Sequence, residues 1–481
     1  MMLLLIILTP LVASGLSFFI KKNSTVFLNT VAVLSASIEL IAVMNIVFAV
    51  VKNGEYALAS YLAVNSIGAI LIMIIAVVNF SASIYSVSYL RVEVLKEIIG
   101  FSRVREYFAL LHLFVLAMFF SVLTTNPILM WIAIEATTLS TVFLISFYNK
   151  PSATEATWKY MIINSLGLLL GFFGTVLFLY PSLRSGHLGL VNWQTISAGA
   201  GNFDPFVVKM AFIFVLIGYG TKVGFVPMHT WRPDAYSKAP IPIVALLSGS
   251  LLNVAFLAIL RFKMIVDLAV GKDFSQNLFI FFGIISIVIA SFHMFGQKNY
   301  KRLLAYSSIE HAGILALGFG FGGLAMFAAL LHMIYHALVK SILFLSAGNV
   351  FLKYSSTKIS KIKGMLEVLP ITGVLFIIGF LAIVGVPPFG IFLTEFTIFS
   401  VGIKTHPIVV IIALMALALV FVSFLRHISG MLFNKKEEDI PIGESGAWTT
   451  LPILFLVAIF IFLSFYLPQF MTVLLNKATL F

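Results

Sequence analysis

Several ionisable side chains lie inside long apolar stretches of the sequence. The candidates for function among them are three glutamates, two lysines and four histidines, namely Glu39, Glu135, Glu395, Lys222, Lys340, His293, His311, His332 and His336. A charged side chain at the centre of a bilayer costs about 2.5 to 3.5 kcal/mol on insertion scales, so its retention calls for a reason. Acids and bases of these types can take up and release protons, and proton transfer is the chemistry that the sequence predicts.

Glu135 and Lys222 are the first predicted pair. When an acid and a base approach each other away from water, both stay charged. When they separate, the lysine tends to lose its proton, which can pass to a neighbouring site. We therefore interpret the pair as a proton switch. The alternative is a static salt bridge that fixes helix packing, although a buried ion pair is an expensive way to hold a bundle.

A second group recurs at helical spacing. His332, His336 and Lys340 are four residues apart and fall within about 80° of arc on one helix face, which favours a proton relay. Two histidines at this spacing can also bind a metal, but no third ligand is spaced nearby in the sequence, so we expect no metal site. A purely structural role remains open for His332. His311 follows Glu310 in a stretch whose hydroxyls can hold water, and it is a further relay candidate.

The remaining charged groups are less informative. Glu39 and His293 have no charged partner that the sequence identifies, so local hydrogen bonding explains them as well as function does. Asp234 is expected near Arg232 and Lys238, in an ion cluster that stabilises a helix end and gates access. The acidic run at 437–439 is expected to be a solvated loop.

The composition shows which solvent surrounds these groups. Of 481 residues, 61% are hydrophobic and 10% are charged, against roughly 25% charged in soluble domains. A water-soluble fold is excluded. The absence of cysteine excludes disulfides, cysteine-ligated iron–sulfur clusters and thiol catalysis in this chain. The net charge of +12 is spread over short loops, which indicates membrane topology and not nucleic-acid binding.

The apolar stretches predict an all-α polytopic membrane protein of about 14 transmembrane helices, since each crossing needs about 20 apolar residues. The first stretch is interpreted as a span and not as a removed signal peptide. The predicted spans are 1–20, 24–50, 58–90, 106–123, 127–148, 157–181, 205–229, 240–262, 276–296, 302–320, 322–352, 366–402, 407–433 and 449–473.

The loops predict the orientation of these spans. One set of loops holds 20 Lys and Arg residues, while the other set, with the termini, holds 8. The positive-inside rule therefore places both termini outside. No linker is long enough to separate a soluble domain, and the largest loop, 181–204, is expected outside.

Two predicted spans contain helix-breaking residues. Span 205–229 carries several glycines and Pro227 close to Lys222, and span 366–402 carries Gly385, Pro387 and Pro388 close to Glu395. Broken helices at corresponding positions indicate an inverted repeat with ion sites at the breaks. The expected organisation is helices 1–3 in 1–105, two inverted five-helix repeats in 106–262 and 276–433, and helix 14 in 449–481.

Several motifs resemble one known family. The stretch 220–240, GTKVGFVPMHTWRPDAYSKAP, continuing through 245–249, resembles the signature of the antiporter-like subunits of respiratory complex I, Mrp cation/proton antiporters and membrane-bound hydrogenases. The stretch 301–311 and the histidine-containing eleventh span also match, and with Glu135 the resemblance covers most of the chain. Within the family, 385–395 and 248–254 look most similar to hydrogenase-4 component F.

This resemblance implies roles for individual residues along a hydrated axis at the membrane midplane. It implies that Glu135 and Lys222 form the coupling pair and that Glu395 is the terminal exchanger. It also implies a central relay of His311, His336 and Lys340, with His332, Glu310, Asn253 and Asp234 as secondary candidates. Many relatives carry lysine where this chain has Asn253 or Glu395. A proton-carrying role at position 253 is therefore in doubt, while water binding remains.

The resemblance also implies partners. The expected function is that of a non-redox, proton-translocating subunit in a hydrogenase- or complex I-like oxidoreductase, in a bacterial or archaeal plasma membrane. Other antiporter-like and small membrane subunits, lipid and a peripheral redox arm are the expected partners. No cofactor is expected in this chain, since iron–sulfur clusters and a [NiFe] or quinone site would belong to those partners. The chain ends at Phe481 without the long lateral helix of the distal complex I subunit, so that position is not expected.

Two alternatives remain open. One is a subunit of a Mrp-type Na⁺/H⁺ antiporter without a redox partner, and the other is a structural membrane subunit that no longer pumps. The sequence does not distinguish H⁺ from Na⁺ as the coupling ion, because Glu and Lys serve either.

Overall fold

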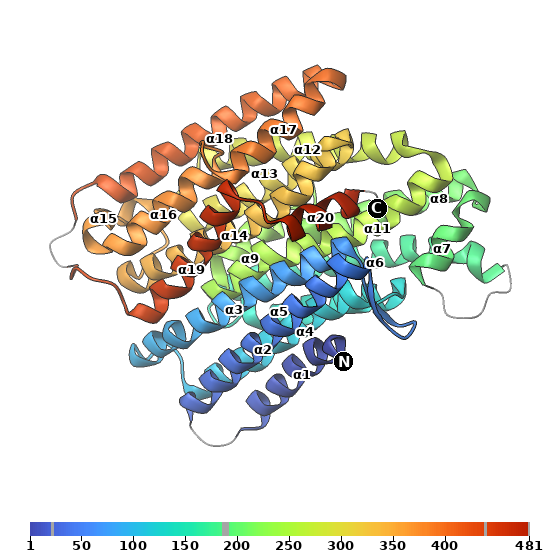
Figure 1. Cartoon of the computed structure of the whole chain (residues 1–481). Helices are drawn as coiled ribbons and strands as arrows, with labels where there is room; N and C mark the ends of the chain where they lie inside the picture. The colour runs from blue at the N-terminus through green and yellow to red at the C-terminus, as the bar shows by residue number, and fades with distance from the viewer. Residues whose placement is uncertain (21–23, 185–191, 437–439, 480–481) are drawn as a thin grey trace.

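The structure is a computed structural model that describes residues 1–20, 24–184, 192–436 and 440–479. Within this part of the chain almost all regular structure is helical, apart from one two-stranded hairpin. Figure 1 shows most of the long helices running roughly side by side in one bundle, with both chain ends toward the same end of it. The predicted all-α polytopic fold is confirmed.

The elements of the first half of the chain are α1 (Met2–Phe19), α2 (Thr25–Asn53), β1 (Tyr56–Leu58), β2 (Leu62–Val64), α3 (Ser66–Leu95), α4 (Phe101–Leu123), α5 (Pro127–Ile145), α6 (Pro151–Arg184), α7 (Trp193–Gly199), η1 (Ala200–Asn202), α8 (Pro205–Val223) and α9 (Trp231–Lys238). Those of the second half are α10 (Ile241–Leu246), η2 (Leu247–Leu251), α11 (Leu252–Val270), α12 (Lys272–Phe295), α13 (Tyr300–Phe321), α14 (Leu324–Tyr354), η3 (Ile359–Lys361), α15 (Met365–Val368), α16 (Pro370–Ile383), α17 (Gly390–Thr405), α18 (Pro407–Phe433), α19 (Ala447–Phe465) and α20 (Gln469–Thr479).

Thirteen helices of the described residues are long and apolar enough to cross a membrane. The predicted span 366–402 is not among them, because it is divided into the two short helices α16 and α17. With this divided crossing included, the helices agree with the predicted number of about 14.

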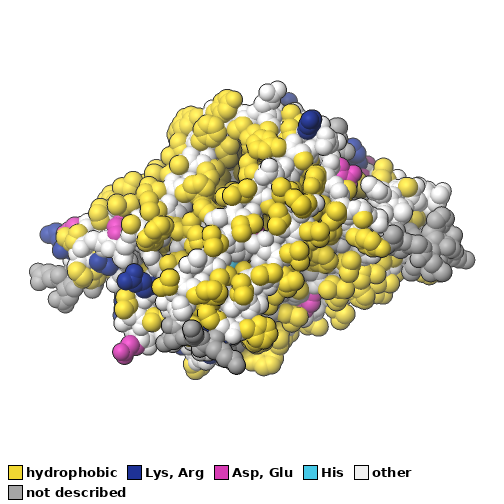
Figure 2. Space-filling model, turned by 60° about the horizontal axis from the view of Figure 1, so that its bottom comes forward, with side chains coloured by type: hydrophobic (Ala, Val, Ile, Leu, Met, Phe, Trp, Pro, Cys, Tyr) yellow, Lys and Arg dark blue, Asp and Glu magenta, His cyan; other side chains and the backbone are white. Residues whose placement is uncertain are grey.

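The outer helices face lipid and the central ones do not. In α1 and α18 only 33% of the most apolar stretch is buried, whereas in α13 and α14 all of it is. Figure 2 shows hydrophobic side chains covering most of one face, with charged side chains mainly toward its two ends. The buried ionisable residues of α13 and α14 are therefore shielded from lipid by surrounding helices.

Glycines allow some of these helices to approach closely. On α6, Gly171 lies against Gly218 of α8, and on α12, Gly283 lies against Gly313 of α13, so that an added Cβ at these positions would meet backbone atoms. Small residues at such contacts let helix backbones pack closely in a membrane, where burial of apolar surface does not by itself drive association.

Both predicted helix breaks are present. The helix α8 ends at Val223, and Gly224 follows it in the left-handed conformation at φ 82°. The second break separates α16 from α17, and Gly385 within it has φ 69°. Glycine adopts these positive φ values without the steric penalty of other residues, which is why the breaks fall there.

Three local features differ from the predicted spans. Residues 56–64 form the β1–β2 hairpin, so the third helix starts at Ser66 and not at residue 58. The expected last span, 449–473, is interrupted between Phe465 and Gln469, because Pro468 disfavours helical backbone in the residue before it. Within the eighth span, residues 247–251 form a π-helical segment, η2, that hydrophobic length alone does not reveal.

Part of the predicted loop 181–204 is helical, since it contains α7 and η1. The predicted solvated loop of Glu437, Glu438 and Asp439 lies outside the described residues.

Candidate functional site

Glu135 and Lys222 come together through a threonine. Lys222 is buried at the end of α8, and its Nζ donates to the Thr138 hydroxyl at 2.8 Å. The same hydroxyl lies 3.3 Å from Glu135 Oε2, one turn away on α5. Among the described residues, the two charged groups share Thr138 and form no direct ion pair. Glu135 is only partly buried and also accepts from the Ser165 hydroxyl at 3.0 Å.

Tyr160 of α6 completes the surroundings of Lys222. Its hydroxyl accepts from Lys222 Nζ at 2.9 Å and lies 2.7 Å from the Thr141 hydroxyl. Neither Thr138 nor Tyr160 was identified as a site residue from the sequence. Thr138 is three residues after Glu135 and thus on the same helix face, which is a signal that could have found it. Tyr160 has no comparable local signal.

Arg232 connects the first helix break to the centre of the bundle. Its buried guanidinium donates to the carbonyl of Val223 and lies 3.3 Å from the carbonyl of Ser308 on α13. An added Cβ at Gly224 would meet this guanidinium at 2.9 Å, so glycine is required there for close approach as well as for backbone conformation.

The middle of the site lies between α13 and α14. Lys340 is fully buried and donates to the Leu304 carbonyl at 3.0 Å. His336 is also fully buried, its ring 5.2 Å from that of His311. The predicted stripe of His332, His336 and Lys340 therefore faces the interior of the bundle.

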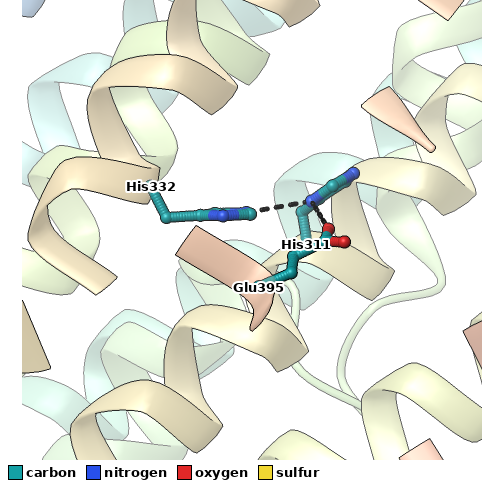
Figure 3. A group of neighbouring side chains, drawn as sticks. All are labelled: His311, His332 and Glu395. Atoms are coloured by element: carbon teal, nitrogen blue, oxygen red, sulfur yellow. Dashed lines mark hydrogen bonds and ion pairs between the residues drawn. The ribbon is translucent and has the colours of Figure 1, made fainter. Parts of the chain in front are cut away.

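The second helix break supplies the last group, shown in Figure 3. His311 Nδ1 lies 3.0 Å from His332 Nε2 and 3.8 Å from Glu395 Oε1. His332 is thus part of the histidine cluster and not an isolated core residue. Glu395 is close to the backbone at Gly385, where an added Cβ would contact its carboxylate. Folding groups His332 with His311 of α13 and Glu395 of α17, and not with His336, the histidine that the sequence considered beside it as a possible metal ligand.

Asn253, which follows η2, is buried and donates to the Gly249 carbonyl at 2.9 Å. Its side-chain oxygen has no hydrogen-bond partner among the described residues. A buried amide oxygen is normally satisfied by protein or by water. The position therefore fits the water-binding role that the sequence left open.

The ion cluster around Asp234 has different members from those expected. Asp234 pairs with Arg302 at 2.7 Å and with Lys159 at 3.4 Å. Arg232 points into the bundle instead, and Lys238 donates to Ser152 at 2.9 Å. Neither predicted neighbour forms an ion pair with Asp234 among the described residues, since Arg232 faces the bundle interior and Lys238, although one turn from Asp234 on α9, bonds Ser152 of α6.

Glu39 and His293 have local partners. Glu39 accepts from Ser35 at 2.7 Å and from Asn79 of α3 at 2.8 Å. His293 is exposed, bonds the Ile289 carbonyl at 2.8 Å and stacks on Tyr306. These contacts agree with the interpretation that Glu39 and His293 form local hydrogen bonds.

Glu93 and Lys301 are ionisable residues outside the predicted spans that lie buried inside the bundle. Glu93 near the end of α3 accepts from the Tyr148 hydroxyl at 2.6 Å. Lys301 at the start of α13 donates to the carbonyls of Ser237 and Ala239, each at 3.3 Å. Because both residues lie next to hydrophilic loops in the sequence, their burial could not be predicted from it.

Comparisons with known proteins agree with the motifs. The family described as "NADH:quinone oxidoreductase/Mrp antiporter, TM" matches residues 124–422. The hydrogenase-4 component F homolog of Methylacidiphilum infernorum (isolate V4) is 37% identical over 353 residues, which cover 73% of this chain and 74% of that protein. The chain spans about half the length of several other curated relatives that it matches.

Solved structures give the same fold. A chain of the membrane-bound sulfane sulfur reductase, an archaeal respiratory membrane complex, has a TM-score of 0.88 at 25% identity, covering 99% of this chain and 96% of that chain. A chain of the Mrp complex from Dietzia sp. DQ12-45-1b has a TM-score of 0.85 at 18% identity, with the same coverage of 99% and 96%.

The family match covers more than half of the sequence and includes both helix breaks. The chain belongs to the NADH:quinone oxidoreductase/Mrp antiporter family of transmembrane proteins.

Proposed function

We propose that this chain is a non-redox, proton-translocating subunit of a hydrogenase- or complex I-like respiratory assembly. The observation that supports the proposal is that ionisable side chains occur at intervals through the interior from α5 to α17. This series begins at Glu135, passes Lys222, Lys340 and the histidines, and reaches Glu395.

The first step takes place between Glu135 and Lys222. The Thr138 hydroxyl can donate to one group while it accepts from the other, so it holds both at one point without a direct ion pair. A change in the charge of Glu135 thus alters the electrostatic energy of a proton on Lys222. Because Glu135 is the more exposed of the two, it is the group on which a neighbouring subunit can act.

Arg232 couples the two halves of the series. A guanidinium stays charged in proteins, so Arg232 does not carry the proton itself. Its guanidinium lies 3.5 Å from the backbone carbonyl of Lys222 and 3.3 Å from that of Ser308 on α13. Because Arg232 carries a fixed positive charge, the proton occupancy of Lys222 and that of Lys340 both depend on it.

Buried polar atoms without partners support a hydrated route through the centre. Among the described residues, both ring nitrogens of His336, Glu310 Oε2, Ser307 Oγ and Asn253 Oδ1 make no hydrogen bond within the chain. Such groups in native proteins usually bond to ordered water. We propose that water at these positions links Lys340 to His311 and Glu395.

The identity with a hydrogenase-4 component F homolog favours a hydrogenase-type assembly. In this proposal the partners are other antiporter-like and small membrane subunits together with a peripheral redox arm. Iron–sulfur clusters and a [NiFe] or quinone site reside in those partners. The proposal includes two inverted five-helix repeats and a multi-pass position in a bacterial or archaeal plasma membrane with both termini outside.

The test uses inverted membrane vesicles that contain the assembled complex. Lys222→Ala and Glu135→Ala are expected to abolish proton uptake, measured with a pH-sensitive dye, while the subunit remains in the membrane. The matched controls are Lys404→Ala and Glu55→Ala, which remove the same side chains at exposed positions. Full proton uptake by either site variant would contradict the proposal.

A Mrp-type Na⁺/H⁺ antiporter without a redox partner is the second candidate, since the chain shares its fold with a subunit of a Mrp complex. The two candidates differ in their partners. Copurification of a nickel or iron–sulfur subunit supports the first, whereas copurification of small antiporter subunits alone, with Na⁺-dependent proton movement, supports the second.

A further inference from the structure

Three side chains from three helices place their ligand atoms around one point inside the bundle. His311 is on α13, His332 on α14 and Glu395 on α17, and one ligand atom of each lies within 4.8 Å of the other two. In Figure 3 the His332 ring and the Glu395 carboxylate both approach the His311 ring. The sequence separates these residues by up to 84 positions, so only folding assembles them.

The donor types are those of a transition-metal site. Two imidazole nitrogens and one carboxylate oxygen form the ligand set of zinc sites that keep a fourth position open for water. The distances are 3.0 Å between His311 Nδ1 and His332 Nε2, and 3.8 Å between His311 Nδ1 and Glu395 Oε1. Small side-chain movements bring all three atoms to the roughly 2.0 to 2.2 Å that zinc requires.

The outer nitrogen of each histidine already has a partner. His311 Nε2 lies 3.0 Å from the Ile383 carbonyl, which can only accept, so His311 presents a lone pair at Nδ1. His332 Nδ1 lies 2.8 Å from the Thr394 hydroxyl. Metal-binding histidines almost always donate their second N–H to a carbonyl, carboxylate or water, which fixes the tautomer and the ring orientation.

Thr394 allows His332 to take the required tautomer without losing a hydrogen bond. When His332 Nδ1 carries the hydrogen, Thr394 accepts it and donates its own hydrogen to the Ile391 carbonyl at 2.8 Å. This arrangement leaves the lone pair of His332 Nε2 directed toward His311 Nδ1. Both inner nitrogens can then bind one cation, and each outer nitrogen remains bonded.

The surroundings balance the charge of a bound cation. Glu310 places a carboxylate oxygen 3.4 Å from His311 Nε2, in addition to the carboxylate of Glu395. The histidine side chains are fully buried, whereas that of Glu395 is 12% exposed and is the ligand nearest to the surface of the chain.

We propose that His311, His332 and Glu395 bind one divalent transition-metal ion of the Zn²⁺ class, with water in the fourth position. This inference is tested separately from the proposed proton translocation, because the test measures equilibrium binding to the folded chain. A bound ion would occupy the two nitrogen lone pairs that a proton relay through these histidines requires.

The experiment measures metal binding to the purified full chain in detergent. Zn²⁺ is titrated in competition with a chromophoric chelator, and Co²⁺ is added separately to observe the strong visible absorption of tetrahedral cobalt. One Zn²⁺ per chain and a tetrahedral Co²⁺ spectrum are expected. Each of the three ligand variants, His311→Gln, His332→Gln and Glu395→Gln, should weaken Zn²⁺ binding by at least about tenfold. Each removes a direct ligand, and the loss of a hydrogen-bond partner of a ligand alone already costs roughly 10- to 100-fold in affinity.

Two controls and one additional variant complete the test. His336→Gln is the matched control, since it is buried on the same helix one turn from His332 but is not one of the three ligands, and His406→Gln tests binding at the surface. Both should retain the site. Thr394→Val keeps all three ligands and should weaken Zn²⁺ binding by roughly tenfold through the lost outer hydrogen bond, so it remains informative if a ligand variant fails to fold.

The proposal is overturned if the three ligand variants bind Zn²⁺ as tightly as the unaltered chain, or if Co²⁺ gives only the weak spectrum of an octahedral ion. If His406→Gln lost Zn²⁺ binding while the three ligand variants kept it, the metal would likewise be assigned to the surface. Neither result depends on whether the complex translocates protons.

Discussion

Thr138 contributes a hydroxyl group that two charged side chains share. It accepts from Lys222 and lies within hydrogen-bond distance of Glu135, so it defines how the two groups communicate. Hydrogen bonds to charged groups are worth about 1.5 to 3 kcal/mol. At the scale of single residues, a small uncharged side chain therefore contributes to the proposed proton switch beside the charges themselves.

Thr138→Val is expected to slow proton translocation roughly 10- to 100-fold, because about 1.5 to 3 kcal/mol of stabilisation is lost from the transfer step. The measurement is the initial rate of proton uptake by inverted vesicles. Thr137→Val is the control, since the Thr137 hydroxyl bonds only the carbonyl of Ile134 in its own helix. Equal rates in the two variants would show that the shared hydroxyl has no part in transfer.

The two broken helices place a charged side chain against a glycine with positive φ. At the first break Gly224 contacts Arg232, and at the second Gly385 contacts Glu395. In each break, one glycine therefore allows both the left-handed backbone and the close approach of the charged side chain. At the scale of elements, each break interrupts a helix and also leaves space in which a charged side chain lies against the glycine.

Gly385→Ala should destabilise the folded chain by about 1 to 2 kcal/mol, the usual penalty of a left-handed residue with a Cβ. It should also reduce proton uptake, because the new methyl group displaces the Glu395 carboxylate. The stability is measured by unfolding in detergent. Gly296→Ala is the control, since Gly296 has φ −92° and open space around its Cβ position. Equal stability of both variants would contradict the strain at Gly385.

At the scale of the whole molecule, an apolar surface surrounds a polar interior. The wholly buried helices α13 and α14 carry most of the central ionisable residues, while α1 and α18 present large hydrophobic side chains outward. This arrangement reverses the usual distribution of a soluble protein. The cost of charge in lipid explains it, because ionisable groups are tolerated only where other helices or water surround them.

The proposed orientation can be tested with single cysteines, because the natural chain has none. Lys52→Cys and Lys404→Cys should react with a membrane-impermeant maleimide in intact cells, since both positions are exposed in the loops predicted outside. Lys150→Cys and Lys298→Cys, exposed in the other set of loops, should react only after permeabilisation. The reverse pattern would place the termini inside.

The sequence by itself determined the membrane class, most helix boundaries, both helix breaks and the identity of the principal buried ionisable residues. These properties depend on local features, namely the length of apolar stretches, the cost of a charge within them and the backbone preferences of glycine and proline. The hairpin at 56–64 and the interruption before Gln469 were missed, because hydrophobic length does not distinguish a helix from other apolar conformations.

Only the tertiary structure decided which of these residues meet. The contact of Lys222 with Tyr160, the pairing of Asp234 with Arg302 and the approach of Glu395 to His311 join residues 62, 68 and 84 positions apart. Such contacts depend on how helices pack and on which face each presents. No pattern within a single helix contains that information, so the grouping of His311, His332 and Glu395 could not be predicted from the sequence.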